Sequence, residues 1–258
     1  MRDNGLRGRI AFVTGAGGGI GRAVVRLLAE EGARVVATDH DAALLAPIVE
    51  EFGAGVRTEL LDMRSTEAVE AVVARIEAEE GPIDLGASVA GVLSWQTVVE
   101  TSDDEWDRAF DVNTKGVFRL GRALARRMQP RRRGALVTVA SNAAGVPRHA
   151  MAAYAASKAA AAMFTRCLGL ELAPHGIRCN IVAPGSTLTP MQTGMWADDD
   201  GASQVIAGAP EIFKAGIPLG KLATPEDVAE AVVFLLSARA GHITMSDLYV
   251  DGGATLRA

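Results

Sequence analysis

Short apolar runs alternate with longer amphipathic segments along almost the whole chain. The runs are mostly apolar, which is typical of strands covered on both faces of a parallel sheet, and the segments between them repeat their hydrophobic positions with a helical period. The runs predict strands at Ile10–Val13, Arg34–Thr38, Val56–Leu61, Ile83–Val89, Ala135–Ala140, Arg178–Ala183 and Leu248–Val250. The segments predict helices at Gly19–Glu31, Asp41–Phe52, Ser65–Glu79, Ser102–Met128, Met151–Leu172 and Pro225–Ser237.

Strict alternation of strand and helix predicts an α/β fold, a doubly wound parallel sheet of about seven strands with helices on both faces. No internal repeat, low-complexity tract or linker divides the chain, so we predict a single domain over residues 1–258. One stretch, residues 186–221, breaks the pattern and is rich in Gly, Pro, Thr and Met. Because a connection this long inside a compact domain is usually functional, we predict that it forms a lid over a substrate site.

Composition and charge exclude several classes of partner. The chain is 49% hydrophobic and 22% charged, as in ordinary globular proteins. Its formal net charge of −5 argues against a nucleic acid or an anionic membrane as partner. No apolar run is long enough to span a bilayer, and Met1–Leu6 lack the apolar stretch of a secretion signal. We therefore expect a cytoplasmic protein with no membrane partner.

The histidines and cysteines give no sign of a metal site or a disulfide. The histidines show no metal-ligand spacing, so no metal site is predicted. The two cysteines, Cys167 and Cys179, fall in a predicted helix and a predicted strand. We interpret both as small core residues rather than as a disulfide.

A glycine-rich turn, Thr14–Gly21, follows the first predicted strand and opens the first predicted helix. Gly15, Gly19 and Gly21 let the backbone turn tightly and approach a pyrophosphate, and the helix that includes Ile20 presents its N-terminal amides to that group. A glycine-rich turn alone is a weak signal, but its position between strand and helix raises its value. The fold is therefore predicted to be Rossmann-like and to bind a dinucleotide.

An aspartate at a strand end favours NAD over NADP as the cofactor. Asp39 ends the second strand, where a carboxylate can accept hydrogen bonds from the adenosine ribose and repel a 2′-phosphate. The alternative is a simple strand-end turn residue. Asp62, at the end of the third strand, is interpreted equally well as a partner of the adenine amino group or as a loop cap.

The pair Tyr154 and Lys158 carries the strongest chemical signal. Side chains four residues apart share one face of a helix, so an ammonium group can lie beside a phenol. A neighbouring positive charge favours the phenolate and lowers its pKa, which gives a proton acceptor for the oxidation of a carbon–oxygen bond. Ser141 lies upstream, just after the apolar run Ala135–Ala140.

Taken together, these motifs resemble the short-chain dehydrogenase/reductase family over essentially the whole length. The matching residues are Thr14, Gly15, Gly19, Gly21, Asp62, Asn113, Ser141, Tyr154, Lys158, Pro184 and Gly185. The resemblance implies that Ala90, Gly91, Pro184, Gly185, Thr187 and Thr189 also contact the cofactor. One departure is visible, because Ser88-Val89 stands where the family usually has two asparagines.

The resemblance narrows to the bacterial 2,3-dihydro-2,3-dihydroxybenzoate dehydrogenases of catechol siderophore synthesis. It rests on Thr138–Ala144 with Pro147-Arg148, on the lid segments that contain Pro184–Gln192, Trp196 and Phe213–Lys221, and on His242-Ile243-Thr244. Asn142 departs from the aspartate expected beside the serine. The implied reaction is the NAD-dependent oxidation of a ring secondary alcohol on a cyclohexadiene carboxylate.

The same resemblance implies the role of each catalytic residue. Tyr154, as phenolate, accepts the hydroxyl proton while hydride leaves the same carbon for the nicotinamide. Lys158 lowers the Tyr154 pKa and holds the nicotinamide ribose, and Ser141 orients the reacting oxygen. Asn113 holds a water that links Lys158 to solvent. The alternatives are a strand-end cap for Ser141 and a helix kink or turn residue for Asn113.

A carboxylate substrate needs a cationic partner, and Arg148 is the first candidate because an arginine fork matches a carboxylate. A surface salt bridge is its alternative. Met191 and Gln192 on the lid are second candidates. Trp196 is predicted either to cover the flat ring or to pack inside the lid.

Three other functions stay open from the sequence. The substrate could be an amino-bearing relative, dihydro-3-hydroxyanthranilate, and Asn142 keeps this alternative open. The enzyme could be a generic short-chain alcohol dehydrogenase. A non-catalytic NAD-binding regulator is a further alternative. By family resemblance, we expect a homotetramer.

Overall fold

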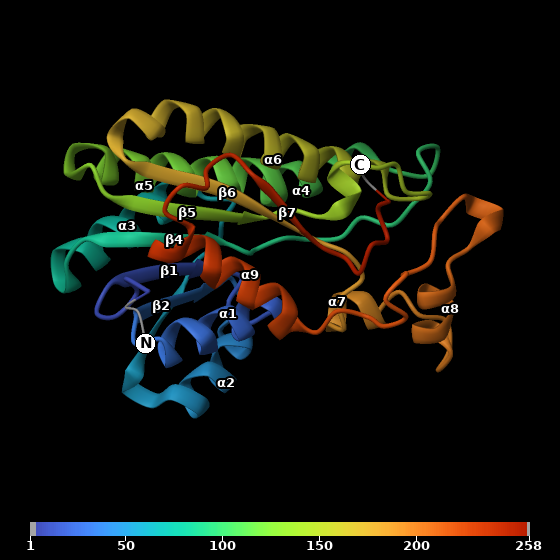
Figure 1. The fold of residues 1–258 in the computed structure, drawn as a ribbon, viewed down its shortest axis with the longest axis horizontal. Helices are drawn as coiled ribbons and strands as arrows, with labels where there is room; N and C mark the ends of the chain where they lie inside the picture. Colours follow the sequence, from blue (N-terminus) through green and yellow to red (C-terminus); the bar gives the residue numbers. More distant parts are fainter. Residues whose placement is uncertain (1–3, 257–258) are drawn as a thin grey trace.

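The computed structural model describes residues 4–256 and places a single seven-stranded sheet at the centre of the molecule (Figure 1). All paired strands run parallel, in the order β3-β2-β1-β4-β5-β6-β7. The strands are β1 (Ile10–Thr14), β2 (Arg34–Asp39), β3 (Val56–Leu60), β4 (Ile83–Ser88), β5 (Gly134–Val139), β6 (Ile177–Pro184) and β7 (Asp247–Val250). The predicted doubly wound parallel sheet is confirmed.

Helices cover both faces of this sheet (Figure 1). On one face lie α1 (Gly19–Glu30), α2 (Ala42–Phe52) and α9 (Pro225–Leu236). On the other lie α3 (Thr66–Glu80), α4 (Asp103–Phe110), α5 (Gly116–Arg131) and α6 (Ala152–Leu172). Two short helices, α7 (Pro190–Thr193) and α8 (Gly201–Ala207), belong to the long connection after β6.

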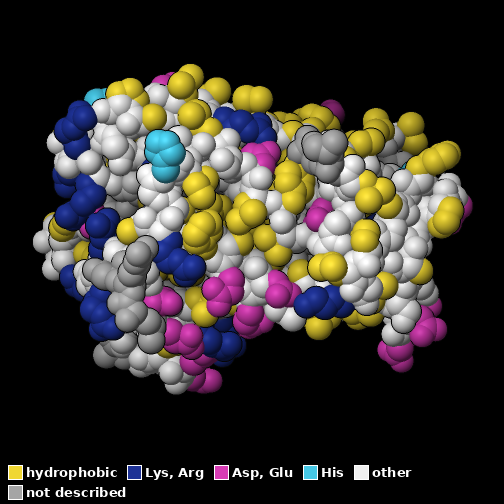
Figure 2. All heavy atoms as spheres, viewed as in Figure 1, with side chains coloured by type: hydrophobic (Ala, Val, Ile, Leu, Met, Phe, Trp, Pro, Cys, Tyr) yellow, Lys and Arg dark blue, Asp and Glu magenta, His cyan; other side chains and the backbone are white. Residues whose placement is uncertain are grey.

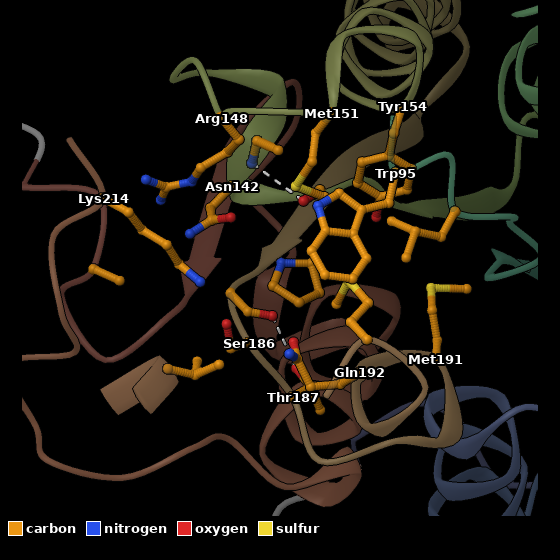
Figure 3. A pocket seen from close by; sticks show the side chains of 18 of the residues that line it. Trp95, Asn142, Arg148, Met151, Tyr154, Ser186, Thr187, Met191, Gln192 and Lys214 are labelled. Atoms are coloured by element: carbon orange, nitrogen blue, oxygen red, sulfur yellow. Dashed lines mark hydrogen bonds between the residues drawn. The ribbon is translucent and has the colours of Figure 1, made fainter. Parts of the chain in front are cut away.

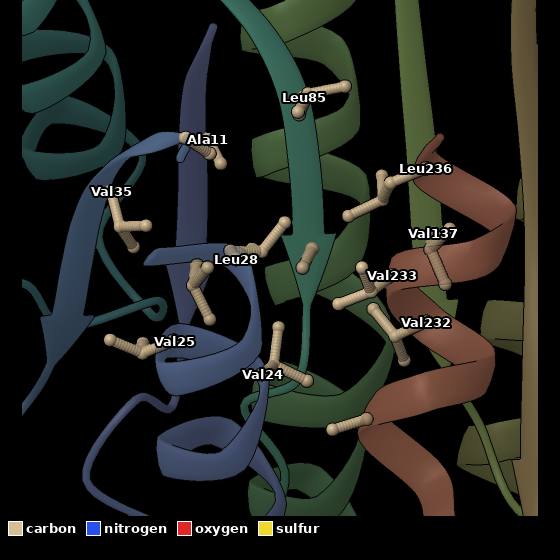
Figure 4. Packing of buried hydrophobic residues seen from close by; sticks show 14 of the residues in the cluster. Ala11, Val24, Val25, Leu28, Val35, Leu85, Val137, Val232, Val233 and Leu236 are labelled. Atoms are coloured by element: carbon tan, nitrogen blue, oxygen red, sulfur yellow. The ribbon is translucent and has the colours of Figure 1, made fainter. Parts of the chain in front are cut away.

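The core between the sheet and the α1–α9 layer is built from aliphatic side chains (Figure 4). Val24 and Leu28 of α1 and Val233 of α9 are buried against the strands. Each such side chain contributes about 1.5–3 kcal/mol when removed from water. The opposite face has its own core around Phe12 and Leu124, both fully buried. Burial on both faces explains why a central strand such as β1 is almost entirely apolar.

The predicted helix over 102–128 is not continuous. It consists of α4, a π-helical turn at Asp111–Lys115, and α5, which extends to Arg131. Ser102 caps α4 by accepting a hydrogen bond from the Glu105 N–H at 3.2 Å. A π turn inserts one extra residue without altering the hydrophobic pattern enough to reveal it, and such turns are frequent at functional sites.

The long connection predicted as a lid projects from the carboxyl end of the sheet, where α7 and α8 lie (Figure 1). Its two ends meet, because Leu188 donates to the Ala223 carbonyl at 2.9 Å and the Ala223 N–H donates to Ser186 at 3.1 Å. Acidic side chains gather at the α8 end of the lid (Figure 2), where Asp198–Asp200 are exposed. The lid is therefore anchored at its base and extends into solvent.

Several expectations from composition can be set against the described residues. Cys179 is buried as predicted, but Cys167 is exposed on α6, so it is not a core residue, and both thiols are free. Within residues 4–256, no helix is long and apolar enough to cross a membrane. No group of three or more His, Cys, Asp or Glu side chains in that range could hold a metal ion. Met1–Asp3, part of the segment considered for a secretion signal, lie outside the described residues.

Candidate active site

The main cavity opens where β4, β5 and β6 end and the lid begins, and its volume is about 750 Å³. Of the predicted site residues, it brings together Ile20, Gly91, Ser141, Arg148, Tyr154, Lys158, Pro184, Gly185, Thr187, Thr189, Met191, Gln192 and Trp196. Gly15, Gly19, Gly21, Asp39, Asp62, Ala90 and Asn113 are outside its lining. A crevice beyond the carboxyl ends of parallel strands is where such folds bind ligands.

Tyr154 and Lys158 lie on the first turns of α6, as the sequence predicted. The Lys158 Nζ atom is 5.9 Å from the centroid of the Tyr154 ring. It donates a hydrogen bond to the Val139 carbonyl at 2.9 Å, and the side chain is almost fully buried. The ammonium group is thus tied to the end of β5 rather than to the phenol.

Burial sets the ionisation of both groups. It raises the pKa of Tyr154 above its ordinary value, while a hydrogen bond to Ser141 acts in the opposite direction. It lowers the pKa of Lys158 to about 8. The sequence predicted a lowered Tyr154 pKa, but desolvation opposes the charged form of the phenol, and here it outweighs the hydrogen bond with Ser141.

Ser141 has a structural role in addition to its place in the site. It begins the 3₁₀ turn Asn142–Ala144, and its Oγ accepts a hydrogen bond from the Ala143 N–H at 3.1 Å. The capping alternative therefore holds. Its hydrogen bond with Tyr154 shows that the cap also places the hydroxyl beside the phenol.

Asn113 lies in the π turn and is completely buried. Its amide nitrogen donates to the Val92 carbonyl at 2.9 Å and to the Ser157 Oγ at 3.0 Å, and its oxygen accepts from the Val92 N–H at 2.8 Å. Both amide hydrogens are used, so the side chain fastens the loop after β4 to α6. The predicted water link to Lys158 is not tested by these contacts.

The glycine-rich turn fits the pyrophosphate of a dinucleotide. Gly15 has φ of +64°, and a Cβ there would come within 2.6 Å of the Ala90 Cα. A side chain at Gly21 would overlap the Gly15 carbonyl. The N-cap of α1 is Gly18, which supplies no side-chain cap, so the first amides of the helix stay available to an anion.

The loop after β4, where Ser88-Val89 replaces the two asparagines, is fastened to β1. The Thr14 Oγ1 accepts hydrogen bonds from the N–H groups of Val89 and Ala90, at 3.1 and 3.2 Å. A Cβ at Gly91 would lie 3.0 Å from the Lys158 Nζ. The backbone therefore approaches Lys158 closely, and β1 holds it in place.

Asp39 and Asp62 both have local partners. The Asp39 carboxylate accepts hydrogen bonds from the Gly17 N–H at 3.0 Å and from the His40 N–H at 2.8 Å. Asp39 therefore does have a structural role in the turn at the strand end. Each carboxylate oxygen has two acceptor sites, which leaves capacity for ribose hydroxyls. Arg64 pairs with Asp62 at 2.8 Å and lowers the pKa of that carboxyl, so Asp62 does cap a loop.

The base of the lid meets the glycine turn. A Cβ at Gly19 would lie 2.9 Å from the Thr189 Cγ2. Thr189 caps α7, and the buried Thr187 donates to the Gly185 carbonyl at 3.2 Å. These contacts place the Pro184–Thr189 segment between the turn and the cavity.

The predicted substrate residues do line the cavity, and Figure 3 shows Arg148, Met191 and Gln192 around it. Trp196 packs so tightly on Gly201 that a Cβ there would overlap its indole ring. Its Nε1 is buried without a hydrogen-bond partner among the described residues. Of the two roles considered for Trp196, packing inside the lid is the one with direct contacts.

Two lining residues had no role assigned from the sequence. Trp95 is 53% exposed and reaches into the cavity (Figure 3). Its signal was an aromatic residue in the loop that follows β4. Lys214 enters from the lid, and its signal was a lysine, one of two in a segment already predicted to cover the site.

Asn142 also lines the cavity, where its amide donates a long hydrogen bond of 3.4 Å to Asp251. The Asp251 carboxylate further accepts from the Gly253 N–H at 3.0 Å and from the Thr255 hydroxyl. An amide at position 142 therefore caps a buried carboxylate. An aspartate there would place two acids side by side.

Comparison with known proteins matches the whole chain. A family model described as enoyl-(acyl carrier protein) reductase matches residues 15–255. The chain is 55% identical to the 2,3-dihydro-2,3-dihydroxybenzoate dehydrogenase of Bacillus subtilis (strain 168), covering 99% of each, and 43% identical to the enzyme of that name from Escherichia coli (strain K12), covering 97% of this chain and 98% of the other. A solved short-chain type dehydrogenase/reductase from Mycobacterium marinum is 31% identical with a TM-score of 0.88, covering 98% of both chains.

Proposed function

The chain belongs to the short-chain dehydrogenase/reductase family, and we propose that it oxidises 2,3-dihydro-2,3-dihydroxybenzoate to 2,3-dihydroxybenzoate with NAD. The observation that carries the proposal is a single cavity in which Tyr154, Ser141 and Lys158 face the same space as Arg148. The identity of 55% to the Bacillus subtilis enzyme supports this substrate. The reaction would serve the synthesis of a catechol siderophore.

The chain's own residues supply positioning and proton transfer. Ser141 hydrogen-bonds the reacting ring oxygen, and Tyr154 accepts its proton. Lys158 stabilises the phenolate that must form before that transfer, and Arg148 orients the ring through its carboxylate. The bound cofactor supplies the hydride acceptor.

Several residues would hold NAD. The turn at Gly15, Gly19 and Gly21, followed by Ile20, suits the pyrophosphate, and Asp39 suits the adenosine ribose. The negative charge of Asp39 beside the Gly17 amide supports NAD over NADP, since a 2′-phosphate would meet it. Asp62, Ala90, Gly91, Pro184, Gly185, Thr187 and Thr189 complete the proposed cofactor contacts.

The proposal extends to the assembly and its location. Exposed apolar side chains on α5 and α6, among them Phe118, Met163 and Leu170, support a homotetramer that would cover them. A reaction that reduces NAD needs an intracellular pool to regenerate it, which supports the cytoplasm. The whole chain, residues 1–258, would act as one domain, with the lid over its site.

Tyr154→Phe is the variant that tests this mechanism. We expect turnover of the diol to fall by about 10²–10⁴-fold, the range typical of a lost acid–base group, while the NAD dissociation constant stays unchanged. Tyr249, the only other tyrosine, lies outside the main cavity, so Tyr249→Phe is the matched control. Near-wild-type turnover by Tyr154→Phe with normal NAD binding would refute the mechanism.

A further inference from the structure

Two cationic side chains in the main cavity have no anionic partner. Arg148 follows the turn after β5, and Lys214 belongs to the lid. Within residues 4–256, neither head group forms an ion pair or a side-chain hydrogen bond. Partly buried charges are normally paired, so two unpaired cations in one cavity indicate that a ligand supplies the negative charge.

The two charges also act on each other. Burial lowers the pKa of Lys214, and the positive charge of Arg148 lowers it further. Burial lowers the pKa of Arg148 as well. Figure 3 shows both side chains reaching the same side of the cavity, where the amide of Asn142 also points. An anion bound there would relieve the repulsion and regain part of the cost of desolvation.

The other charged groups nearby do not neutralise this pair. Asp251 attracts Arg148, but its carboxylate is already satisfied by Gly253, Thr255 and Asn142. The remaining charged or titratable lining groups are Glu211, His149, Lys158 and Tyr154. The acidic residues Asp198–Asp200 are exposed on the lid and do not line the cavity. The cavity is thus cationic inside a chain whose net charge is −5.

The lid backbone fixes the position of Lys214. Lys214 and Ala209 exchange two backbone hydrogen bonds, of 2.9 and 3.0 Å, which close a tight loop. Phe213, at the tip, has φ of +54°, a left-handed conformation that is uncommon for a bulky residue. The loop adopts this conformation at Phe213, and the side chain of the next residue, Lys214, is directed toward the cavity.

We propose that Lys214 and Arg148 together hold the carboxylate of the ring substrate, one from the lid and the other from the scaffold. The inference rests on the proposed function for the identity of that substrate. Arg148 alone could bind a carboxylate, but the second cation lies on a different element. Substrate binding would therefore join the lid to the sheet, and Lys214 would determine specificity for carboxylate-bearing rings.

Binding of benzoate to the enzyme with saturating NAD tests the site without turnover, because benzoate is a flat ring carboxylate with no alcohol to oxidise. Calorimetric titration should show that Lys214→Met weakens benzoate binding by about tenfold or more, the loss typical of one charge-assisted contact. Lys214→Arg should keep most of the affinity. Lys221→Met is the matched control, since Lys221 is an exposed lysine of the same lid.

A second experiment measures turnover of two substrates. One is the diol carboxylate, and the other is the same ring diol without the carboxylate. We expect Lys214→Met to lower kcat/KM for the carboxylate, mainly through KM, at least about tenfold more than for the neutral diol. Circular dichroism and the melting temperature of each variant report whether the lid substitution disturbs the fold.

Each outcome bears on the proposal. Wild-type affinity for benzoate in Lys214→Met, or no benzoate binding by the wild type, would overturn it. Equal losses on both diols would also overturn it and leave the proposed function standing. Benzoate binding that depends on Lys214, in an enzyme that does not oxidise the diol, would support the anion site and refute the proposed substrate.

Discussion

Single residues in this site serve local structure and chemistry at once. Ser141 caps a 3₁₀ turn and hydrogen-bonds Tyr154, and Asp39 closes the strand end while it carries charge next to the glycine turn. The structural and functional interpretations of these residues are therefore not exclusive. A side chain that is held by its own backbone neighbours is also well oriented for a ligand.

Lys158 is the clearest case of a proposed catalytic residue whose burial costs stability. Its pKa in the folded state is about 8, below the ordinary 10.5. Between these values the unfolded chain binds more protons than the folded one, so the contribution of Lys158 to stability rises with pH across this window. Below pH 8 the full cost of burying the ammonium group is present.

Lys158→Met should therefore abolish turnover and raise the melting temperature at pH 7. We expect a gain on the order of 1–3 kcal/mol, because the cost of the buried charge exceeds the lost hydrogen bond to Val139. The gain should shrink at pH 9.5, where Lys158 is largely neutral in the wild type. Thermal unfolding at both pH values measures this, and a lower melting temperature at pH 7 would contradict it.

At the scale of elements, the π turn between α4 and α5 marks the limit of pattern analysis. The sequence predicted one helix over 102–128, and the apolar positions on both sides of the turn are consistent with that. One inserted residue rotates Asn113 toward Val92. Only the partner across the fold reveals the insertion, because that contact spans 21 residues.

Arg178 joins β6 to the end of α9. Its guanidinium donates to the carbonyls of Leu235 at 2.7 Å, Leu236 at 3.2 Å and Ser237 at 3.0 Å. These carbonyls belong to the last residues and the C-cap of α9, where they have no partners within the helix. Burial lowers the pKa of Arg178, so its charge is retained at the cost of desolvation.

Arg178→Met should lower the free energy of unfolding by about 2–4 kcal/mol, because several buried carbonyls lose a charged donor. Arg239 is the matched control, since it is exposed at the same helix end, and Arg239→Met should cost at most about 0.5 kcal/mol. Urea unfolding measures both variants. Equal stabilities would show that water replaces the guanidinium without loss.

At the scale of the whole molecule, the sequence predicted the order of elements and most of the proposed site. A strand such as β1 is recognisable because burial on both faces makes it almost entirely apolar, and Gly15 or Tyr154 carries its signal in local spacing. Trp95 and Lys214 could not be assigned in this way. They lie 119 residues apart, numbered 95 and 214, and only the folded lid brings them to one cavity.

The distribution of charge bears on the choice between the two ring substrates. The cavity combines Arg148, Lys158 and Lys214 with one lining carboxylate, Glu211. Position 142 is an amide, so it offers no negative charge to a substrate ammonium group. A cationic cavity favours a substrate whose polar groups are a carboxylate and hydroxyls, which is the diol rather than dihydro-3-hydroxyanthranilate.

The most direct test is NAD reduction by the purified wild-type protein, with kcat/KM compared for 2,3-dihydro-2,3-dihydroxybenzoate and dihydro-3-hydroxyanthranilate. We predict that the diol is preferred by at least about tenfold, which corresponds to roughly 1.4 kcal/mol of discrimination in the transition state. Preference for the amino compound, or no reduction of NAD with either one, would contradict the account.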